Sequence, residues 1–269
     1  MSNLQKICLS IGYPIKSSKS PSLHNVGYKA LGIEDQFIYL RAQVKPENLK
    51  MAVEGIKGLG IRGVSVTMPH KQEIMKYLDE VDETAKKIGA VNTVVNDDGK
   101  LIGYNTDWVG AVVALEKKTN LKGKKVAVIG AGGASRAIVY GLTKKGAKVK
   151  IFNRSIEKGE ELAKEFDCGF GEIGEMREIG DYNIIINATS VGMNSDESPI
   201  DKELLNKNQI VFDVIYSPKE TKLIKEAKEK GAKVVYGYEM LLYQAVEQFK
   251  LYTGLEAPVK EMEEFAKNL

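Results

Sequence analysis

A glycine-rich turn in the middle of the chain has the composition of a phosphate site. Gly130, Gly132 and Gly133 directly follow the apolar run 126–129, and helix-forming residues resume at Ala134. This pattern predicts a strand, a tight turn and a helix. Backbone N–H groups in such a turn can approach an anion, and the helix N-terminus adds about half a positive charge. The turn is a candidate phosphate site, although similar turns also connect strands to helices that bind nothing.

The end of the next predicted strand, residues 147–153, distinguishes between the two nicotinamide cofactors. In dinucleotide-binding folds an Asp or Glu at this place accepts hydrogen bonds from the ribose hydroxyls of NAD. Here the chain has Asn153, then Arg154, with Lys158 one helical turn later. A guanidinium can bind a ribose phosphate through two bonds, and an ammonium adds a second charge. The pattern favours NADP over NAD; the alternative is that both cations are ordinary solvated groups.

Lys71 is the candidate acid or base. The strand predicted at 61–68 stops at Pro69, and helical spacing over residues 72–78 places Lys71 in the first turn of a helix. The positive end of a helix disfavours a cation by about 0.3–1 kcal/mol and lowers the pKa of a lysine, as a proton-transfer group requires. The alternative is a lysine that extends into water. His70 is a weaker candidate because neighbouring side chains at a helix start point apart.

Two further polar residues stand at the ends of a predicted hairpin. Residues 90–107 contain two strands joined by an Asn-Asp-Asp-Gly turn, the strongest hairpin signal in the chain. Because a hairpin brings its ends together, Asn92 and Asp107 should flank one spot. Asp107 also precedes a helix expected from Trp108, and capping alone would explain an aspartate there.

Ser18 and Ser20 lie in the loop after the first predicted strand, residues 6–12. Open α/β sheets bind ligands beyond the carboxyl ends of their strands, so both hydroxyls are candidate ligand contacts. The structural interpretation is favoured from this region alone: Pro21 opens a helix, and Ser20 caps it. His24, on the same helix, has no Cys, His or Asp cluster beside it and is not expected to bind a metal.

The second half of the chain supplies a framework for the glycine turn. From residue 124 to about 237, predicted strands alternate with helices, as a doubly wound parallel sheet requires. Buried strands are expected at residues 182–188, 210–215 and 234–236. The loops 189–193 and 216–218 then follow strand ends and should face a cofactor cleft.

The first half predicts a separate α/β domain. Two C-terminal helices, the first over residues 239–252, should fold back on it and close the cleft near a hinge at Gly237. We therefore expect a two-domain α/β protein. Residues 1–107, completed by 239–269, would bind substrate, and residues 108–238 would form a Rossmann-type NADP-binding domain.

The composition excludes several other classes of protein. With 269 residues and 43% hydrophobic content, the chain can bury two modest cores. Its net charge of +3 comes from interspersed charges, without a basic block for nucleic acid. Cys8 and Cys168 form no close pair for zinc or redox chemistry, and the apolar run ending at Gly12 is too short for a signal peptide or membrane span. We expect a cytoplasmic, metal-free monomer or homodimer.

Seven motifs, in order along nearly the whole chain, resemble those of the shikimate dehydrogenase family. They are Ser18-Lys-Ser20-Pro21 with His24-Asn25, Val66-Thr67-Met-Pro-His-Lys71, Gly89-Ala-Val-Asn92-Thr, Tyr104-Asn-Thr-Asp107, Gly130-Ala-Gly-Gly-Ala134, Asn153-Arg-Ser155 with Lys158, and Leu241-Leu-Tyr-Gln244. The resemblance implies reversible NADPH-dependent reduction of 3-dehydroshikimate to shikimate, a step of aromatic amino acid biosynthesis through chorismate.

The same resemblance assigns roles to individual residues. Lys71 and Asp107 would form the catalytic pair and handle the proton, while hydride passes directly between nicotinamide and substrate. Ser18 and Ser20 would bind the substrate carboxylate. The ring substituents would contact Thr67, Asn92, Tyr216 and Gln244. The cofactor would contact Glu83, Gly130, Ala131, Gly132, Gly133, Ala134, Asn153, Arg154, Ser155, Lys158, Thr189, Val214 and Gly237.

Two positions depart from the family pattern. Ser17 stands where the family usually has His, and Ser65 where it usually has Asn. We expect the change at Ser65 to loosen a hydrogen bond near the substrate hydroxyls, which keeps acceptance of quinate open. The alternatives are a quinate or quinate/shikimate dehydrogenase that uses NAD, and a non-catalytic module that binds NADP(H) or shikimate.

Overall fold

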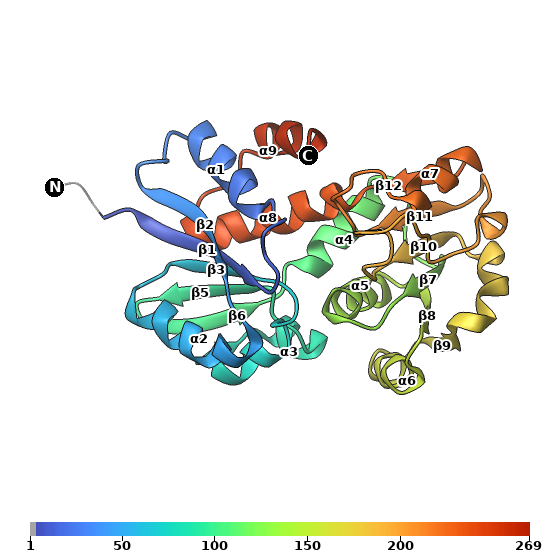
Figure 1. The fold of residues 1–269 in the computed structure, drawn as a ribbon, viewed down its shortest axis with the longest axis horizontal. Coiled ribbons are helices and arrows are strands. Elements are labelled where there is room, and N and C mark those ends of the chain that lie inside the picture. The colour runs from blue at the N-terminus through green and yellow to red at the C-terminus, as the bar shows by residue number, and fades with distance from the viewer. Residues whose placement is uncertain (1–3) are drawn as a thin grey trace. The chain divides into compact units, whose positions relative to one another are not determined.

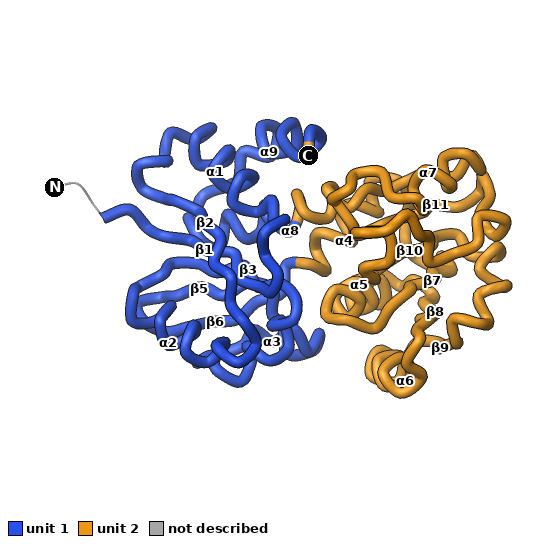
Figure 2. Tube along the Cα trace, viewed as in Figure 1, with its two compact units in different colours: residues 1–106, 244–268 blue, residues 107–243, 269 orange. Residues whose placement is uncertain are grey.

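The chain forms two compact α/β units (Figures 1 and 2). The structure is a computed structural model, and it describes residues 4–269. Unit 1 contains the described residues up to Thr106 together with 244–268, and unit 2 contains 107–243 and Leu269. The α/β class predicted from the sequence is confirmed. The functional division into residues 1–107 with 239–269 and 108–238 stays a prediction.

Unit 1 is built on a six-stranded mixed sheet in the order β2-β1-β3-β5-β6-β4. Its strands are β1 (Lys6–Gly12), β2 (Phe37–Gln43), β3 (Gly63–Val66), β4 (Glu80–Val81), β5 (Thr93–Asp97) and β6 (Lys100–Tyr104). β1 runs parallel to β2 and β3, whereas β5 is antiparallel to both β3 and β6. The carboxyl ends of β1, β3 and β6 therefore share one edge of the sheet with the start of β5. We call this the site edge.

The expected hairpin is present. Asp98 and Gly99, with φ of 47° and 89°, make the two-residue turn between β5 and β6. Two consecutive positive φ values are typical of the type I′ turn, whose twist matches that of the strands it joins. The ends of the hairpin therefore meet at the site edge.

The helices of unit 1 cover this sheet. They are α1 (Ser20–Ala30), α2 (Leu49–Gly58), α3 (Glu83–Ile88), the later part of α8 (Gly237–Thr253) and α9 (Val259–Lys267), with 3-10 segments η1 (Pro46–Asn48) and η2 (Glu73–Tyr77). α2 buries Leu49, Val53 and Ile56, a helical spacing that packs against the sheet. Asp82 caps α3 by accepting from Thr84 N at 2.8 Å.

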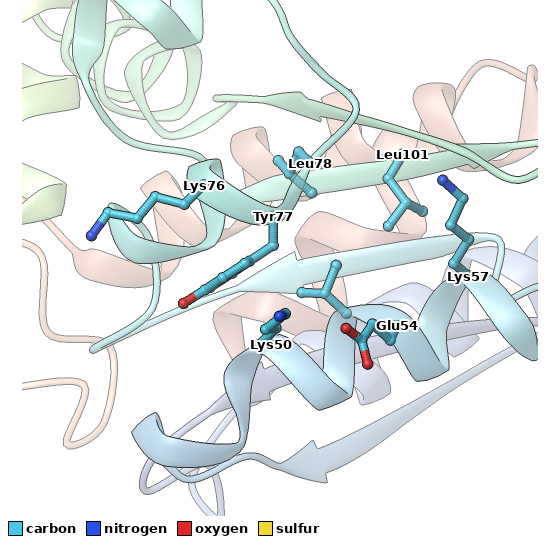
Figure 3. A pocket seen from close by; sticks show the side chains of 8 residues that line it. Lys50, Glu54, Lys57, Lys76, Tyr77, Leu78 and Leu101 are labelled. Carbon is cyan, nitrogen blue, oxygen red and sulfur yellow. The ribbon is translucent and has the colours of Figure 1, made fainter.

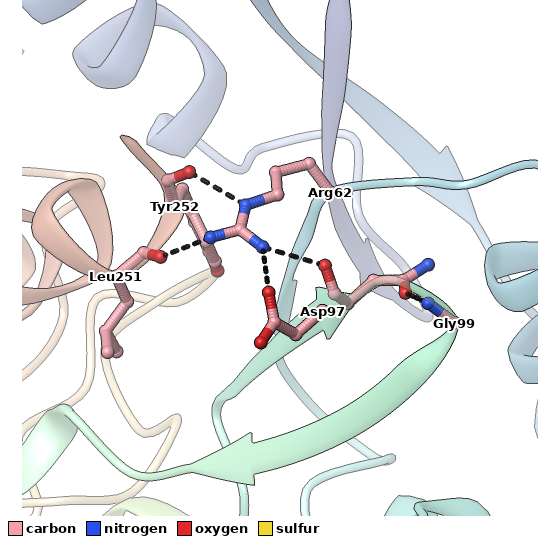
Figure 4. Close-up of polar contacts among 6 residues, drawn as sticks. Arg62, Asp97, Gly99, Leu251 and Tyr252 are labelled. Atoms are coloured by element: carbon pink, nitrogen blue, oxygen red, sulfur yellow. Dashed lines mark hydrogen bonds and ion pairs between the residues drawn. The ribbon is translucent and has the colours of Figure 1, made fainter. Parts of the chain in front are cut away.

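The end of α8 is fixed to the sheet by Arg62, just before β3 (Figure 4). Arg62 Nε donates to Tyr252 O at 3.0 Å and its Nη2 donates to Leu251 O at 3.3 Å. Its Nη1 donates to Asn96 O at 2.8 Å. The last carbonyls of a helix have no partner within the helix, so the guanidinium supplies donors that they lack. The C-terminal segment thus packs back on the first unit, as the sequence predicts.

Unit 2 is a six-stranded parallel sheet in the order β12-β11-β10-β7-β8-β9. Its strands are β7 (Lys125–Ile129), β8 (Lys148–Asn153), β9 (Gly169–Glu172), β10 (Ile184–Asn187), β11 (Ile210–Asp213) and β12 (Lys233–Val235). The strand order reverses between β7 and β10, as in doubly wound dinucleotide-binding sheets. The sequence did not predict β9, because two of its four residues are glycines and lack a strand signal.

Helices connect these parallel strands. They are α4 (Asp107–Glu116), α5 (Gly133–Lys144), α6 (Ile156–Glu165) and α7 (Lys222–Glu229), with 3-10 segments η3 (Ile173–Asp181) and η4 (Lys202–Leu204). Gly141 lets α5 pack closely on α4, since a Cβ there would lie 2.8 Å from a methyl of Val112. Within residues 4–269, no helix combines the length and the apolar character needed to cross a bilayer.

Candidate functional site

The first predicted site residues, Ser18 and Ser20, follow β1 at the site edge. Both are buried, and Ser18 Oγ lies 3.2 Å from Ser10 Oγ. The prediction that Ser20 caps α1 is wrong: the helix already includes Ser20, and Lys19 is the capping position without a side-chain bond. Leu23 N donates to Lys19 O at 3.1 Å, so the first turn closes one residue earlier than expected. Capping does not account for a serine at position 20.

Thr67 and Lys71 follow β3 on the same edge. Thr67 N donates to Ile11 O at 3.0 Å, which holds the segment against the end of β1. Gly12 is required there, because a Cβ would lie 2.4 Å from Thr67 Cγ2. Val91 N donates to Lys71 O at 2.7 Å, so the backbone of Lys71 is fixed beside the start of β5.

The helix predicted over residues 72–78 is present only as a short 3-10 segment. Residues 68–72 form turns, and only the 3-10 segment η2 follows. The carbonyl of Lys71 is bonded to Val91 N, and this bond competes with the bonds that would continue a helix from Lys71. Lys71 therefore does not lie at the positive end of an α-helix, contrary to the prediction. The case for Lys71 now rests on its place at the site edge.

His70, the competing candidate, is turned away from proton transfer. It is 1% exposed, and its Nε2 lies 2.8 Å from Val44 O, to which it donates. A ring held in this way positions the loop after β2 against the turn that carries Lys71. The lower weight given to His70 agrees with this position.

Asn92 bonds to several polar groups at the site edge. Its Oδ1 accepts from Thr106 N at 2.7 Å and from Thr93 Oγ1 at 2.8 Å. Its Nδ2 donates to Thr106 Oγ1 at 3.0 Å and to Gln244 Oε1 at 3.4 Å. Residues from the hairpin and from α8 thus meet at one amide, although they are distant in sequence.

Asp107 directly follows Thr106 and is 6% exposed. It is the first residue of α4, which begins one position earlier than predicted from Trp108. The chain passes from unit 1 to unit 2 between Thr106 and Asp107. Its partnership with Lys71 stays a prediction.

The glycine turn of unit 2 has the predicted strand-turn-helix form. Gly130 has φ of 109°, and a Cβ there would lie 3.0 Å from Thr189 Cγ2. Gly132 precedes α5 with an extended backbone, and a Cβ on it would meet no protein atom within 4 Å. Ser135, in the first turn of α5, has a buried hydroxyl with no hydrogen-bond partner among the described residues. These features fit the phosphates of a dinucleotide, which need approachable backbone N–H groups at a helix start.

The predicted ribose-phosphate residues follow β8. Asn153 Nδ2 donates to Ser155 O at 2.8 Å and shapes the turn into α6. Arg154 and Lys158 are exposed and, in the part of the chain that the structure describes, form no ion pair. Gly159 lets α6 approach the sheet, since a Cβ would lie 2.2 Å from the ring of Phe170. Both cations thus stand at the end of the second Rossmann strand.

Asp213, at the end of β11, is a site-forming residue that the sequence reasoning missed. It accepts from Thr221 Oγ1 at 2.6 Å, from Ile215 N at 3.1 Å and from Asn187 Nδ2 at 3.1 Å. Burial raises the pKa of its carboxyl to about 6. Asn187 Oδ1 in turn accepts from Thr189 Oγ1 at 2.7 Å. The sequence did contain a signal for this pair, because Asn187 and Asp213 are the polar last residues of the buried apolar strands β10 and β11.

This network supports the loops that carry other predicted cofactor residues. Ile215 lies between Val214 and Tyr216, so the bond from its N–H to Asp213 holds that loop. Gly237 begins α8, and a Cβ on it would lie 2.4 Å from Ile215 O and 2.5 Å from Val214 O. A close approach of α8 to this loop explains the glycine. The proposed hinge at Gly237 stays a prediction.

Glu83 differs from the other predicted cofactor residues. It belongs to α3 of unit 1, and its carboxylate pairs with Lys86 at 2.7 Å. The remaining cofactor residues all belong to unit 2. A role for Glu83 toward the cofactor stays a prediction.

A cavity of about 360 Å³ lies elsewhere on unit 1, between α2 and η2 (Figure 3). Its lining consists of Lys50, Val53, Glu54, Lys57, Lys76, Tyr77, Leu78 and Leu101. None of these is a predicted site residue. Among residues 4–269, no group of three or more His, Cys, Asp or Glu side chains could hold a metal ion.

Comparisons with known protein families agree with the two-part arrangement. Residues 10–94 match the shikimate dehydrogenase substrate binding domain, and residues 112–214 match the shikimate/quinate 5-dehydrogenase model. Residues 237–264 match the shikimate 5′-dehydrogenase C-terminal domain.

Individual relatives cover nearly the whole chain. An NADP(+) shikimate dehydrogenase from Pyrococcus furiosus is 46% identical, over 97% of this chain and 95% of its own. A Thermus thermophilus shikimate 5-dehydrogenase, solved with NADP(H) and shikimate, has a TM-score of 0.91 and 34% identity over 98% of this chain and 99% of its own. A Corynebacterium glutamicum quinate dehydrogenase, solved with NAD, has a TM-score of 0.90 and 30% identity over 99% and 100%.

Proposed function

The chain belongs to the shikimate dehydrogenase family, and on that premise we propose that it catalyses the reversible NADP-dependent reduction of 3-dehydroshikimate to shikimate. The observation that carries the proposal is the gathering of Ser18, Thr67, Lys71 and Asn92 at the site edge of unit 1. Hydroxyl, ammonium and amide groups at one place suit a small acid with several ring hydroxyls. The reaction belongs to aromatic amino acid biosynthesis.

Lys71 and Asp107 handle the proton in this proposal. NADPH, when bound, supplies the hydride that adds to the carbonyl carbon. The carbonyl oxygen then gains negative charge, and the Lys71 ammonium gives it a proton to complete the hydroxyl. Such a positioned donor accelerates a reaction by about 10²–10⁴-fold. The carboxylate of Asp107 orients the ammonium and accepts a hydrogen bond from a neighbouring ring hydroxyl.

In this proposal two kinds of side chain hold the substrate: hydroxyls that donate to its carboxylate, and amides that can donate to or accept from its ring hydroxyls. The hydroxyls of Ser18 and Ser20 donate to the substrate carboxylate, since charge-assisted bonds of this kind are short and strong. Thr67, Asn92, Tyr216 and Gln244 contact the ring substituents. The amides of Asn92 and Gln244 can both donate and accept, which suits hydroxyl groups.

The cofactor is held by unit 2. The backbone from Gly130 to Ala134 faces the pyrophosphate, and the start of α5 favours its charge. Arg154 and Lys158 bind the ribose phosphate, which NAD lacks. The support for NADP is that both cations are exposed at the end of β8, where an acidic residue would favour NAD.

The second candidate is a quinate or quinate/shikimate dehydrogenase that uses NAD. The structural similarity to the quinate dehydrogenase solved with NAD favours it. Initial rates with shikimate and quinate, each with NADP and NAD, separate the two candidates. The proposal expects the highest kcat/KM for shikimate with NADP. A higher value for quinate with NAD would contradict it, and no turnover of either acid would favour a non-catalytic binding module.

A further inference from the structure

A chain of buried hydrogen bonds connects β2 to the site edge through Gln248 of α8. Tyr39 donates its hydroxyl proton to Ser65 Oγ, and Ser65 donates to Gln248 Oε1 at 2.8 Å. Gln248 Nε2 donates to Thr93 Oγ1 at 2.9 Å, and Thr93 donates to Asn92 Oδ1 at 2.8 Å. In every bond the donor is the residue nearer to Tyr39 and the acceptor is the residue nearer to Asn92. The chain of bonds therefore has one direction.

The environment keeps this direction fixed. Tyr39 and Thr93 are 0% exposed, Gln248 is 1% exposed and Ser65 is 7% exposed. Burial raises the pKa of Tyr39, so its hydroxyl keeps the proton that it donates to Ser65. Burial also lowers the pKa of His24, whose Nε2 lies 3.4 Å from Gln248 Oε1, to about 3. A neutral ring adds no charge that would reorder the bonds.

The direction of the bonds determines which end of the Asn92 amide is presented. Asn92 Oδ1 accepts from Thr93 and from Thr106 N, which leaves Nδ2 to donate to Thr106 Oγ1 at 3.0 Å and to Gln244 Oε1 at 3.4 Å. If the amide were turned over, two carbonyl oxygens would face each other between Asn92 and Gln244. Two acceptors at that distance repel.

Ser65, one of the two departures from the family pattern, takes part in this chain of bonds, and its effect on the substrate hydroxyls stays a prediction. The small Ser65 side chain admits the Gln248 amide, which bonds to β3 and β5 together. Ser65 accepts from Tyr39 and donates to Gln248, so its hydroxyl is bonded on both sides. Buried polar networks whose members are all bonded specify one arrangement of their side chains.

We propose that Gln248 is a positioning residue for substrate binding: its amide sets the direction of the bonds and so fixes the orientation of the Asn92 amide, with Nδ2 toward Gln244, the other amide that contacts the ring in the proposed function. The inference rests on the proposed function, in which Asn92 contacts the ring. Gln248 itself lies one helical turn after Gln244 and reaches the ligand only through Thr93 and Asn92.

Two variants interrupt the chain of bonds at neighbouring points. Gln248→Glu introduces a carboxylate that only accepts, so Thr93 turns its proton to that carboxylate and no longer donates to Asn92. Thr93→Val removes the hydroxyl while keeping the shape. We expect each to raise the KM for shikimate about tenfold or more, with the KM for NADP within about twofold of the parent.

Two matched variants serve as controls. Thr93→Ser retains the hydroxyl and should keep the KM for shikimate within about twofold of the parent. Glu247→Gln changes the neighbouring, half-buried residue of α8 and should do the same. A normal KM for shikimate in both Gln248→Glu and Thr93→Val would overturn the proposal, as would an equal loss in Thr93→Ser and Thr93→Val.

A measurement without substrate tests the hydrogen bonds themselves. If Gln248 and Thr93 act through one bond, the double variant Gln248→Met with Thr93→Val should lose less melting temperature than the two single losses together. Additive losses would overturn the inference even in an active enzyme. A parent that oxidises no shikimate would refute the proposed function, whereas the melting temperatures would still test the bonded chain.

Discussion

The site edge of unit 1 differs in construction from the edge of the unit 2 sheet at the carboxyl ends of β7, β8, β10 and β11, which we call the cofactor edge. At the site edge Ser18, Ser20, Asn92 and Gln244 are buried, and Asn92 is bonded to Thr106 and Gln244. At the cofactor edge Gly132 presents backbone with no protein atom near its Cβ position, and Arg154 is exposed. One edge arranges side chains in advance, and the other offers backbone and exposed charge.

The difference indicates what each edge must recognise. A ring with several hydroxyls requires donors and acceptors in fixed places, because unpaired buried polar groups are costly. A phosphate carries charge over several oxygens and can be bound by helix starts and long cations. Changes at the site edge should therefore affect stability together with substrate affinity, and changes at the exposed Gly132 and Arg154 should affect cofactor affinity alone.

The largest expected effect tests the chemistry at the site edge. Lys71→Ala should lower kcat with shikimate by about 10²–10⁴-fold, because the proton of the hydroxyl loses its carrier. The KM for NADP should stay near that of the parent in steady-state assays. Lys76→Ala, in the next segment, is the matched control, since Lys76 is exposed and paired with Glu73. Near-normal turnover of Lys71→Ala would remove Lys71 from the mechanism.

The second prediction concerns the buried carboxylate behind the cofactor edge. The pKa of Asp213 is raised to about 6 in the folded protein, so the folded state binds the proton more tightly than the unfolded state does. Its contribution favours folding at low pH and is lost as the pH rises through about 6, by about 3 kcal/mol.

Asp213→Asn should remove this pH dependence, as urea unfolding at several pH values between 4 and 8 would show. The exposed Asp196 offers a control variant, Asp196→Asn, which should follow the parent. A parallel pH profile in Asp213→Asn would mean that this carboxyl does not titrate in that range. The buried carboxylate of Asp213 would then not distinguish its surroundings from the exposed part of the cofactor edge.

The third prediction addresses cofactor choice. Arg154→Ala should raise the KM for NADP by about 10–100-fold, since a bond to a charged group contributes about 1.5–3 kcal/mol. The KM for NAD and the unfolding free energy should change little, because Arg154 forms no ion pair within the described residues. Lys164→Ala, at the far end of α6, provides the comparison. An equal loss of NAD affinity would show that Arg154 does not recognise the phosphate.

The smallest expected effects compare one glycine from each edge. Gly12→Ala should lower the unfolding free energy by about 1–3 kcal/mol, because the new Cβ would overlap Thr67 Cγ2. Gly132→Ala should leave that free energy nearly unchanged and weaken NADP binding, since its Cβ meets no protein atom. Denaturant unfolding and NADP titration measure both. If Gly132→Ala were the less stable variant, the contrast between the edges would be wrong.

Much of the framework could be predicted because local sequence signals agree with the fold. The glycine turn after residues 126–129 and the Asn-Asp-Asp-Gly hairpin are local sequence patterns, and each is typical of one kind of turn. The alternation of strand and helix after residue 124 likewise identifies the parallel sheet.

The wrong or missing predictions concern residues whose structure depends on contacts with residues distant in the sequence. Lys71 starts no helix because Val91, twenty residues later, takes its carbonyl. The sequence pattern treats Gln248 as one residue of an amphipathic helix, and only the fold shows that it reaches Ser65 and Thr93. Asp213 escaped notice because its partners Asn187 and Thr221 belong to separate loops. Hydrogen bonds between such segments leave no local pattern in a single sequence.

The two ends of α8 belong to different units, and this affects the order in which the units can fold during synthesis of the chain. Unit 2 is essentially continuous in the chain and has its residues by Tyr243, whereas unit 1 still lacks the partners of Arg62, Ser65 and Thr93 at that point. Those partners are synthesised after residues 107–243 of unit 2. The unit that begins first therefore cannot be completed until α8 has been made, and its sheet waits for that helix while the dinucleotide sheet can already close.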